Sequence, residues 1–117
     1  MKPLRVRSKV WLEVDGEPVL GGGREQLLLL IDELGSINAA ARRMGISFRR
    51  AWALIQSMES SLAAPLVLRE KGGAGGGRSV LTPEARILLK RFNSLCRGVN
   101  RIIDKKFAAT FPEEEDL

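Results

Sequence analysis

Apolar residues recur at helical spacing between residues 36 and 62, and the rest of the chain can be arranged around this stretch. After Ser36, the first run is Ile37, Ala40, Ala41 and Met44. Gly45 follows, and glycine accepts the left-handed backbone of a helix end. After Ser47, the inward positions of a second run are Ala51, Leu54, Ile55, Met58 and Leu62. The pattern predicts two helices joined by a tight turn, each with a serine cap.

The spacing of small residues is typical of a helix-turn-helix. Ala41 stands where the two helices would touch, and Gly45 follows four residues later in the turn. An ordinary helical hairpin inside a core is the alternative interpretation. In the helix-turn-helix register, the second helix presents an outward face that can enter the DNA major groove. We expect that face to read bases through Ser47, Phe48, Arg49, Trp52, Ala53 and Gln56.

The N-terminal residues 4–14 alternate between apolar and polar positions, which predicts a strand buried on one side. Asp15-Gly16 is a hairpin turn signal, and residues 17–20 would form the return strand, so we expect a β-hairpin over residues 1–20. The basic face of this strand can contact phosphates or simply face solvent. We favour the solvated face.

Residues 21–34 predict a connection followed by a helix. Gly21-Gly22-Gly23 lacks the motifs of a phosphate-binding loop, so we interpret it as a flexible connection. Residues 24–34 are leucine-rich over more than one face, which implies contacts on two sides of the helix. One side would pack on the helix-turn-helix, and the other on the N-terminal hairpin or on a second subunit.

Residues 66–81 predict a second hairpin, directly after the helix-turn-helix. Two short apolar strands flank the glycine-rich loop 72–77, and a hairpin in this position is a wing. A loop with almost no side chains lets the backbone approach a phosphate closely. Lys71 and Arg78 flank the loop as phosphate candidates.

A long helix is predicted over residues 82–110. Thr82 can cap it, Pro83 suits its first position, and an apolar stripe then continues for many turns. Such a stripe exceeds what this small domain can cover alone, which predicts a homodimer. The expected dimer interface consists of Leu27, Ile31, Leu88, Phe92, Leu95, Val99 and Ile102. Residues 111–117 would form an acidic tail.

Composition favours a polyanionic partner. The 117 residues, taken as a single domain, carry a net charge of +5, and residues 36–78 hold seven Lys or Arg against two acids. The chain has no histidine and one cysteine, Cys96, which excludes a disulfide framework, Cys-based zinc sites and His-based catalysis. We therefore expect no cofactor and no enzyme. Without a signal peptide or an apolar run long enough to span a bilayer, we expect a soluble, cytoplasmic protein that binds no membrane.

Two segments carry a family resemblance: GSINAAARRMGISFRRAW, and VLREKGGAGGGRSVLTP. They resemble the DNA-binding domain of the ModE-type molybdate-responsive transcription regulators, a winged helix related to the LysR-type regulators. The resemblance covers about residues 4–109 and implies a homodimer on a palindromic operator, with the groove-reading helix beginning at Ser47. Members of full length carry a second, molybdate-binding part, which this sequence does not match. Short relatives of the DNA-binding part alone are the more similar ones.

The expected fold class is therefore α+β, mostly α: a winged helix-turn-helix with an N-terminal hairpin and a long C-terminal dimerisation helix. The expected function is sequence-specific binding of double-stranded DNA in transcription regulation. Phosphate contacts that position without specifying are assigned to Ser36, Arg42, Arg43, Arg50, Lys71 and Arg78. Two other hypotheses stay open. One is a protein-interaction module that does not bind DNA; the other is an oxyanion sensor that uses the backbone of the Gly21 or Gly72 loop.

Overall fold

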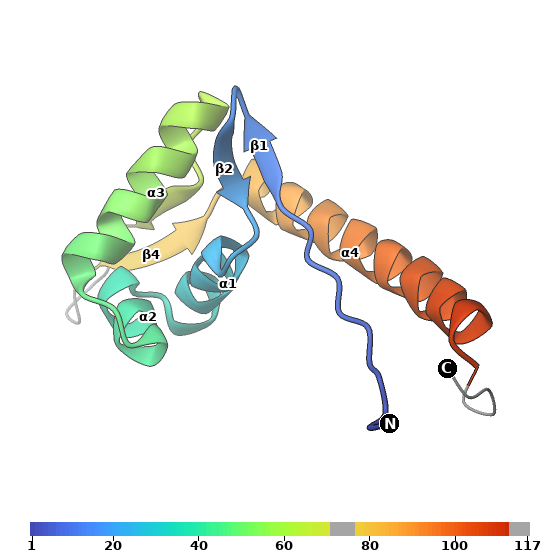
Figure 1. Ribbon diagram of the computed structural model, residues 1–117. Coiled ribbons are helices and arrows are strands. Elements are labelled where there is room, and N and C mark those ends of the chain that lie inside the picture. The colour runs from blue at the N-terminus through green and yellow to red at the C-terminus, as the bar shows by residue number, and fades with distance from the viewer. Residues whose placement is uncertain (71–76, 113–117) are drawn as a thin grey trace.

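The computed structural model describes residues 1–70 and 77–112. Two strands come first, then three helices, two more strands and a long helix (Figure 1). In chain order these are β1 Leu12–Val14, β2 Glu17–Leu20, α1 Arg24–Leu34, α2 Ile37–Met44, α3 Phe48–Leu62, β3 Val67–Glu70, β4 Arg78–Leu81 and α4 Pro83–Thr110. The predicted helix-turn-helix, the wing strands and the long helix all form close to their expected bounds.

Helices α1, α2 and α3 enclose one hydrophobic core. α1 packs on α2 and on β4, α2 packs on α3, and β2 packs on α3. Leu27, Ile31, Ala40, Ala51 and Met58 lie in this core with at most 1% of their surface exposed. α1 thus packs on the helix-turn-helix as predicted, and it also contacts β2, so of the two alternatives for its other side the contact with the hairpin is present.

Three hydroxyl side chains cap the helices as the sequence predicts. The Oγ atoms of Ser36 and Ser47 accept hydrogen bonds from the backbone N–H groups of Ala39 and Arg50, both at 3.1 Å. Thr82 caps α4 in the same way and also donates to the Pro65 carbonyl at 2.9 Å. Each such cap stabilises its helix by about 1 kcal/mol. The caps set where α2, α3 and α4 begin.

The N-terminal hairpin is shorter than predicted. Asp15 and Gly16 both have positive φ, at 50° and 81°, as the expected tight turn requires. Strand β1 begins at Leu12, however, so the strand expected from residue 4 is wrong over residues 4–11. Strand β2 ends at Leu20, so residues before Leu12 have no strand to pair with. At this point the backbone of Gly21 lies against Trp11, because a Cβ atom on Gly21 would be 2.5 Å from the Trp11 Cβ. We refer to residues 1–11 as the arm.

The three glycines between β2 and α1 form a hydrogen-bonded turn and not the flexible connection we expected. The carboxylate of Glu25 accepts hydrogen bonds from the N–H groups of Gly21 and Gly23, at 2.7 and 3.2 Å. A second carboxylate holds the connection between α3 and β3: Glu59 accepts hydrogen bonds from the N–H groups of Leu66 and Val67, at 2.7 and 3.2 Å. Both turns are anchored by acids that the sequence interpretation had left without a role.

The wing is a two-stranded antiparallel sheet. Its register pairs Val67 with Leu81 and Glu70 with Arg78. The wing is joined to the helix-turn-helix because the Ser79 N–H group donates to the Gly35 carbonyl at 2.9 Å. Lys71 and most of the glycine loop lie outside the described residues.

The long helix α4 divides into two halves. In the first half, Ala85, Leu89 and Phe92 are buried against the core, and Arg86 makes a bidentate ion pair with Asp32 of α1 at 2.8–2.9 Å. The second half projects beyond the rest of the molecule (Figure 1). The whole molecule is therefore elongated and measures 65 × 28 × 21 Å. Within the described ranges, no helix is both long enough and apolar enough to cross a membrane.

Candidate nucleic-acid interface

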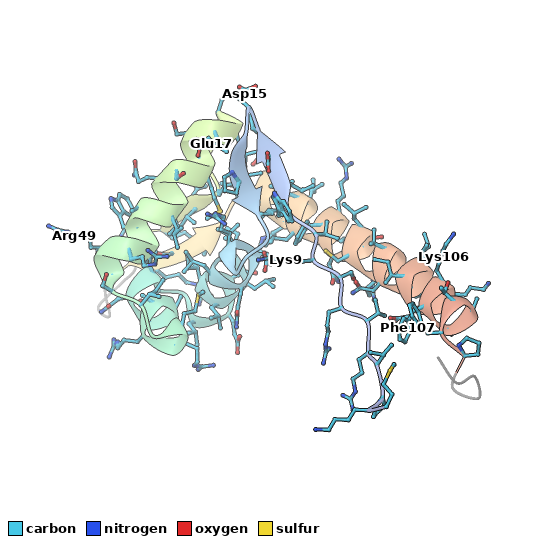
Figure 2. The ribbon with its side chains drawn as sticks, viewed as in Figure 1. Lys9, Asp15, Glu17, Arg49, Lys106 and Phe107 are labelled. Atoms are coloured by element: carbon cyan, nitrogen blue, oxygen red, sulfur yellow. The ribbon has the colours of Figure 1, made fainter. Side chains whose placement is uncertain are left out.

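The outward face of α3 is the centre of the candidate interface. All six predicted base-reading residues are exposed, whereas the opposite face of α3 is buried through Ala51, Ile55 and Met58. Phe48 and Trp52, one turn apart, retain 50% and 46% of their surface. Arg49 projects from the start of the helix, away from the body of the protein (Figure 2). The predicted register of α3 is therefore the observed one, and the whole set is free to meet a partner.

A hollow of about 340 Å³ adjoins this face, where α2, α3 and the wing meet. The start of α2 supplies Ser36, α3 supplies the rings of Phe48 and Trp52, and β3 supplies Arg69. No carboxylate lies among the lining residues, and a helix N-terminus carries partial positive charge. The hollow is thus suited to an anionic group beside an apolar surface. Trp52, whose role the sequence left ambiguous, is one of its walls.

Arg69 is a residue that the sequence analysis did not single out. It lies on β3 opposite Ser79, and its side chain passes close to Gly77. The signal that could have identified it is a cation in a wing strand, three residues before the glycine loop begins at Gly72. Position in the strand alone could not show that Arg69 shares a hollow with α3, because that depends on how the wing packs.

The phosphate candidates occupy different positions around this face. Ser36 uses its hydroxyl as the α2 cap, and Arg50 is exposed on the first turn of α3. Arg42 and Arg43 are exposed in the last turn of α2, where cations are favoured by the helix dipole. Lys71 lies outside the described residues.

Arg78 packs over the turn between α1 and α2. A Cβ atom on Gly35 would lie 3.3 Å from the guanidinium carbon of Arg78, and Gly35 also has a positive φ of 70°. Glycine is required here for both reasons. Arg78 therefore stands beside the start of α2, next to the hollow and not at the wing tip.

Part of the expected dimer interface is buried inside a single chain. Leu27 and Ile31 have no exposed surface, and Phe92 has 6%, so these three residues are corrected to core positions. The wide apolar surface of α1 is covered by α2, β2, β4 and the first half of α4. Leu95 and Ile102 remain exposed at 44% and 68%, and Leu88 and Val99 are half-buried. We call these four residues the free stripe: Leu88, Leu95, Val99 and Ile102.

The free stripe has the spacing of a coiled-coil seam. Together with Phe92 its residues are separated by four, three, four and three positions, which is the alternation that a paired helix requires. A groove of about 610 Å³ lies on another side of α4, between α1 and α4, with Leu29 and Phe92 in its wall and the Asp32–Arg86 ion pair at its edge. Leu29 is 54% exposed. Leu29 is thus the exposed leucine of α1, and it faces this groove and not the free stripe.

The Gly21 turn offers little to an oxyanion. The N–H groups of Gly21 and Gly23 already donate to the Glu25 carboxylate. An incoming molybdate would have to displace this internal anion. The loop at Gly72, the other candidate, lies outside the described residues.

Comparison with protein families decides the relationship of the chain. Residues 25–86 match the family described as bacterial regulatory helix-turn-helix protein, lysR family. The chain belongs to this family. The match begins in α1 and ends in the first turn of α4, so it contains the helix-turn-helix and the wing together.

Named relatives are molybdenum-related proteins. The molybdenum-pterin-binding protein MopB of Rhodobacter capsulatus is 40% identical over 84 residues, which is 72% of this chain and 31% of that protein. The DNA-binding transcriptional dual regulator ModE of Escherichia coli is 36% identical over 81 residues, 69% of this chain and 31% of that protein. The predicted resemblance to ModE-type regulators is confirmed. The chain spans about one third of the length of these relatives.

Solved structures share the fold. The DNA-binding domain in the crystal structure of a CbnR–DNA complex has a TM-score of 0.56 and 23% identity, covering 74% of this chain and 93% of that one. ArgP from Mycobacterium tuberculosis has a TM-score of 0.54 and 24% identity, over 73% of this chain and 30% of that one. The predicted winged helix-turn-helix with a long C-terminal helix is confirmed.

Proposed function

We propose that this chain is a sequence-specific DNA-binding module of a transcription regulator, and that it binds rather than catalyses. The single observation that carries the proposal is the outward face of α3, held by buried residues and framed by the start of α2 and the wing. Membership of a lysR-type regulatory family supports it. A surface of this shape fits the major groove of double-stranded DNA.

Within this proposal, Arg49 reads a base. Its side chain projects from the first turn of α3, and arginine can bind guanine through two hydrogen bonds. Ser47, Phe48, Ala53 and Gln56 add polar and thymine-methyl contacts, and Trp52 lines the groove wall. Ser36, Arg42, Arg43, Arg50, Lys71 and Arg78 hold phosphates and so set the register.

We further propose that the protein acts as a homodimer. The free stripe runs from Leu88 in the first half of α4 to Ile102 in the second half, and its most exposed members, Leu95 and Ile102, follow the last buried residue of the helix, Phe92. A second copy in antiparallel orientation can place its stripe against this one. Such a two-fold pair would present two α3 helices and therefore read an inverted repeat.

The test is selection of bound sequences from a random duplex pool at physiological salt, with and without molybdate. We expect an inverted repeat from the wild-type chain and a shorter, unpaired motif from a double variant of the free stripe, Leu95→Glu with Ile102→Glu. Arg97→Gln, which changes an exposed cation on the opposite side of α4 from Leu95 and Ile102, is the control. Recovery of no motif from the wild type would refute the proposal, and a motif that depends on molybdate would place sensing within this chain.

A further inference from the structure

The arm presents a row of cations to solvent. Residues 1–11 include four Lys or Arg and no acid. Val6, Ser8 and Val10 are half-buried, whereas Arg5, Arg7 and Lys9 are exposed, so the extended backbone turns its apolar side inward and its basic side outward. The alternation that predicted a strand therefore serves to orient charges.

The arm lies beside the second half of α4. The side chains of Ser8 and Asn100 form a hydrogen bond, which joins the middle of the arm to this part of the helix. At the other end of the arm, Val10 packs against the hydrophobic core and Trp11 lies over Gly21. The arm is thus held at two points along its length.

A second row of cations follows one face of α4, and its member Arg97 lies one turn before Asn100. Lys90, Arg97, Arg101 and Lys105 are separated by seven, four and four residues, which places them on one helix face, and all four are exposed. We call these four residues the ridge. Arg97 and Arg101 are neighbours of Asn100, where the arm is attached. At 3.6 residues per turn Lys90, Arg97 and Arg101 stand about 110–150° around the helix from Leu95 and Ile102, so dimerisation through the free stripe leaves these three open, whereas Lys105 is one turn from Ile102.

The charge of the chain is concentrated here. The arm and residues 90–106 together hold ten Lys or Arg and one acid, a net charge of +9, whereas the whole chain has +5. Residues 36–78, which contain the helix-turn-helix and the wing, carry +5, and the remaining segments carry −9. Among the described residues, Arg86 and Asp32 form the one ion pair. No cation of the arm or the ridge is therefore paired with a carboxylate in this part of the structure.

Unpaired like charges at such density repel one another within a Debye length of about 8–10 Å. An extended anionic partner relieves this repulsion. The ridge spans about 22 Å at 1.5 Å per residue, and the arm from Lys2 to Lys9 spans about 23 Å as an extended chain. Duplex DNA carries one negative charge per about 1.7 Å along its axis, so a comparable length of backbone offers many phosphates.

We propose that the arm and the ridge form a second, sequence-independent DNA surface, which binds backbone phosphates outside the bases read by α3. This inference rests on the proposed function, because DNA bound by α3 is the polyanion that would then lie near the arm and the ridge. The surface is separated from α3, because α3 and the second half of α4, which carries Arg97, Arg101 and Lys105, lie at opposite ends of the molecule (Figure 1). A regulator built in this way holds flanking or neighbouring DNA as well as its target sequence.

The decisive measurement is the salt dependence of binding to a random-sequence 40-base-pair duplex, followed by fluorescence anisotropy between 50 and 300 mM KCl. The test variants are Arg97→Gln with Arg101→Gln, and Arg5→Gln with Arg7→Gln. The control is Arg91→Gln with Lys106→Gln, which removes the same charge from the side of α4 that carries the free stripe and not from the ridge, and light scattering checks that this pair keeps the wild-type oligomeric mass. Circular dichroism and thermal unfolding check that each variant folds.

We expect each test pair to lower the slope of log K against log salt by up to about 1.8 per chain, since each phosphate contact contributes about 0.9. The control pair should keep the wild-type slope, and the motif recovered by selection should not change in any variant. Two results would overturn the proposal: wild-type slopes in both test pairs, or an equal fall in the control, which would reflect net charge alone.

Two further results point to another partner and also overturn the inference. One is that the test variants lose binding to phosphatidylserine vesicles while their slope of log K against log salt on DNA stays at the wild-type value. The other is a change in oligomeric mass, measured by light scattering, with an unchanged slope. The proposed function fails separately, if the wild type selects no motif, because the slope on random duplex does not require sequence recognition.

Discussion

Two basic regions of this protein, the α3 face and the arm with the ridge, differ in how their side chains are held. The α3 face is supported by a helix whose inner side is buried through Ala51, Ile55 and Met58, and it adjoins a hollow with two aromatic walls. The arm is an extended segment, half-buried at alternate residues, and the ridge lies on a projecting helix. The second region carries more charge, and the first has the more rigid geometry.

The difference separates affinity from specificity. Phosphate contacts require positive charge at the surface and tolerate small movements, whereas base contacts require donors held in fixed positions. Net charge alone would have placed the DNA-binding function on the arm and α4. The geometry places base reading on α3 and leaves general attraction to the other region.

The largest expected effect concerns the support beneath each region. Ile55→Ala should lower the free energy of unfolding by about 2–5 kcal/mol, because Ile55 is 1% exposed under α3 and its loss leaves a cavity. Val6→Ala, on the half-buried side of the arm, should cost less than about 1 kcal/mol. Urea denaturation of both variants measures the difference. Equal losses would mean that the arm is as firmly packed as α3.

The next effect concerns recognition. Arg49→Ala should weaken binding to the selected sequence by about 1–3 kcal/mol and relax the preference at one base position. Arg101→Ala, the matched change on the ridge, should weaken binding to all sequences alike. Competition titrations against single-base variants of the selected site distinguish the two patterns. If both arginines gave the same pattern, the division between reading and attraction would be wrong.

The smallest effect concerns the polar contacts that hold each region. Ser47→Ala removes the cap of α3 and should lower stability by about 1 kcal/mol, since the N–H of Arg50 loses its acceptor. Ser8→Ala removes the hydrogen bond to Asn100 and should change global stability by no more than about 0.5 kcal/mol, as is usual at exposed positions. Thermal unfolding followed by circular dichroism compares the two. A larger loss in Ser8→Ala would show that the arm stabilises the whole fold.

Local signals in the sequence were enough to determine the helix-turn-helix. Caps at Ser36, Ser47 and Thr82, and a left-handed glycine at Gly45, act on the backbone a few residues away. The same holds for the Asp15-Gly16 turn and for the outward register of α3. These features follow from hydrogen bonds and periodicity within one element, so they could be predicted without knowing what packs on it.

Tertiary structure alone decided which apolar and charged residues were available to a partner. Leu27, Ile31 and Phe92 share the spacing of interface residues, yet they are buried within one chain, because they belong to the hydrophobic core that forms where α1 packs on α2, β2 and β4. Residues 4–11 alternate as a strand does, but β2 is too short to pair with them. The convergence of Arg69 with Trp52, and of the arm with α4, depends on long-range packing. Periodicity records which side of an element is apolar, and only the assembled core determines what covers that side.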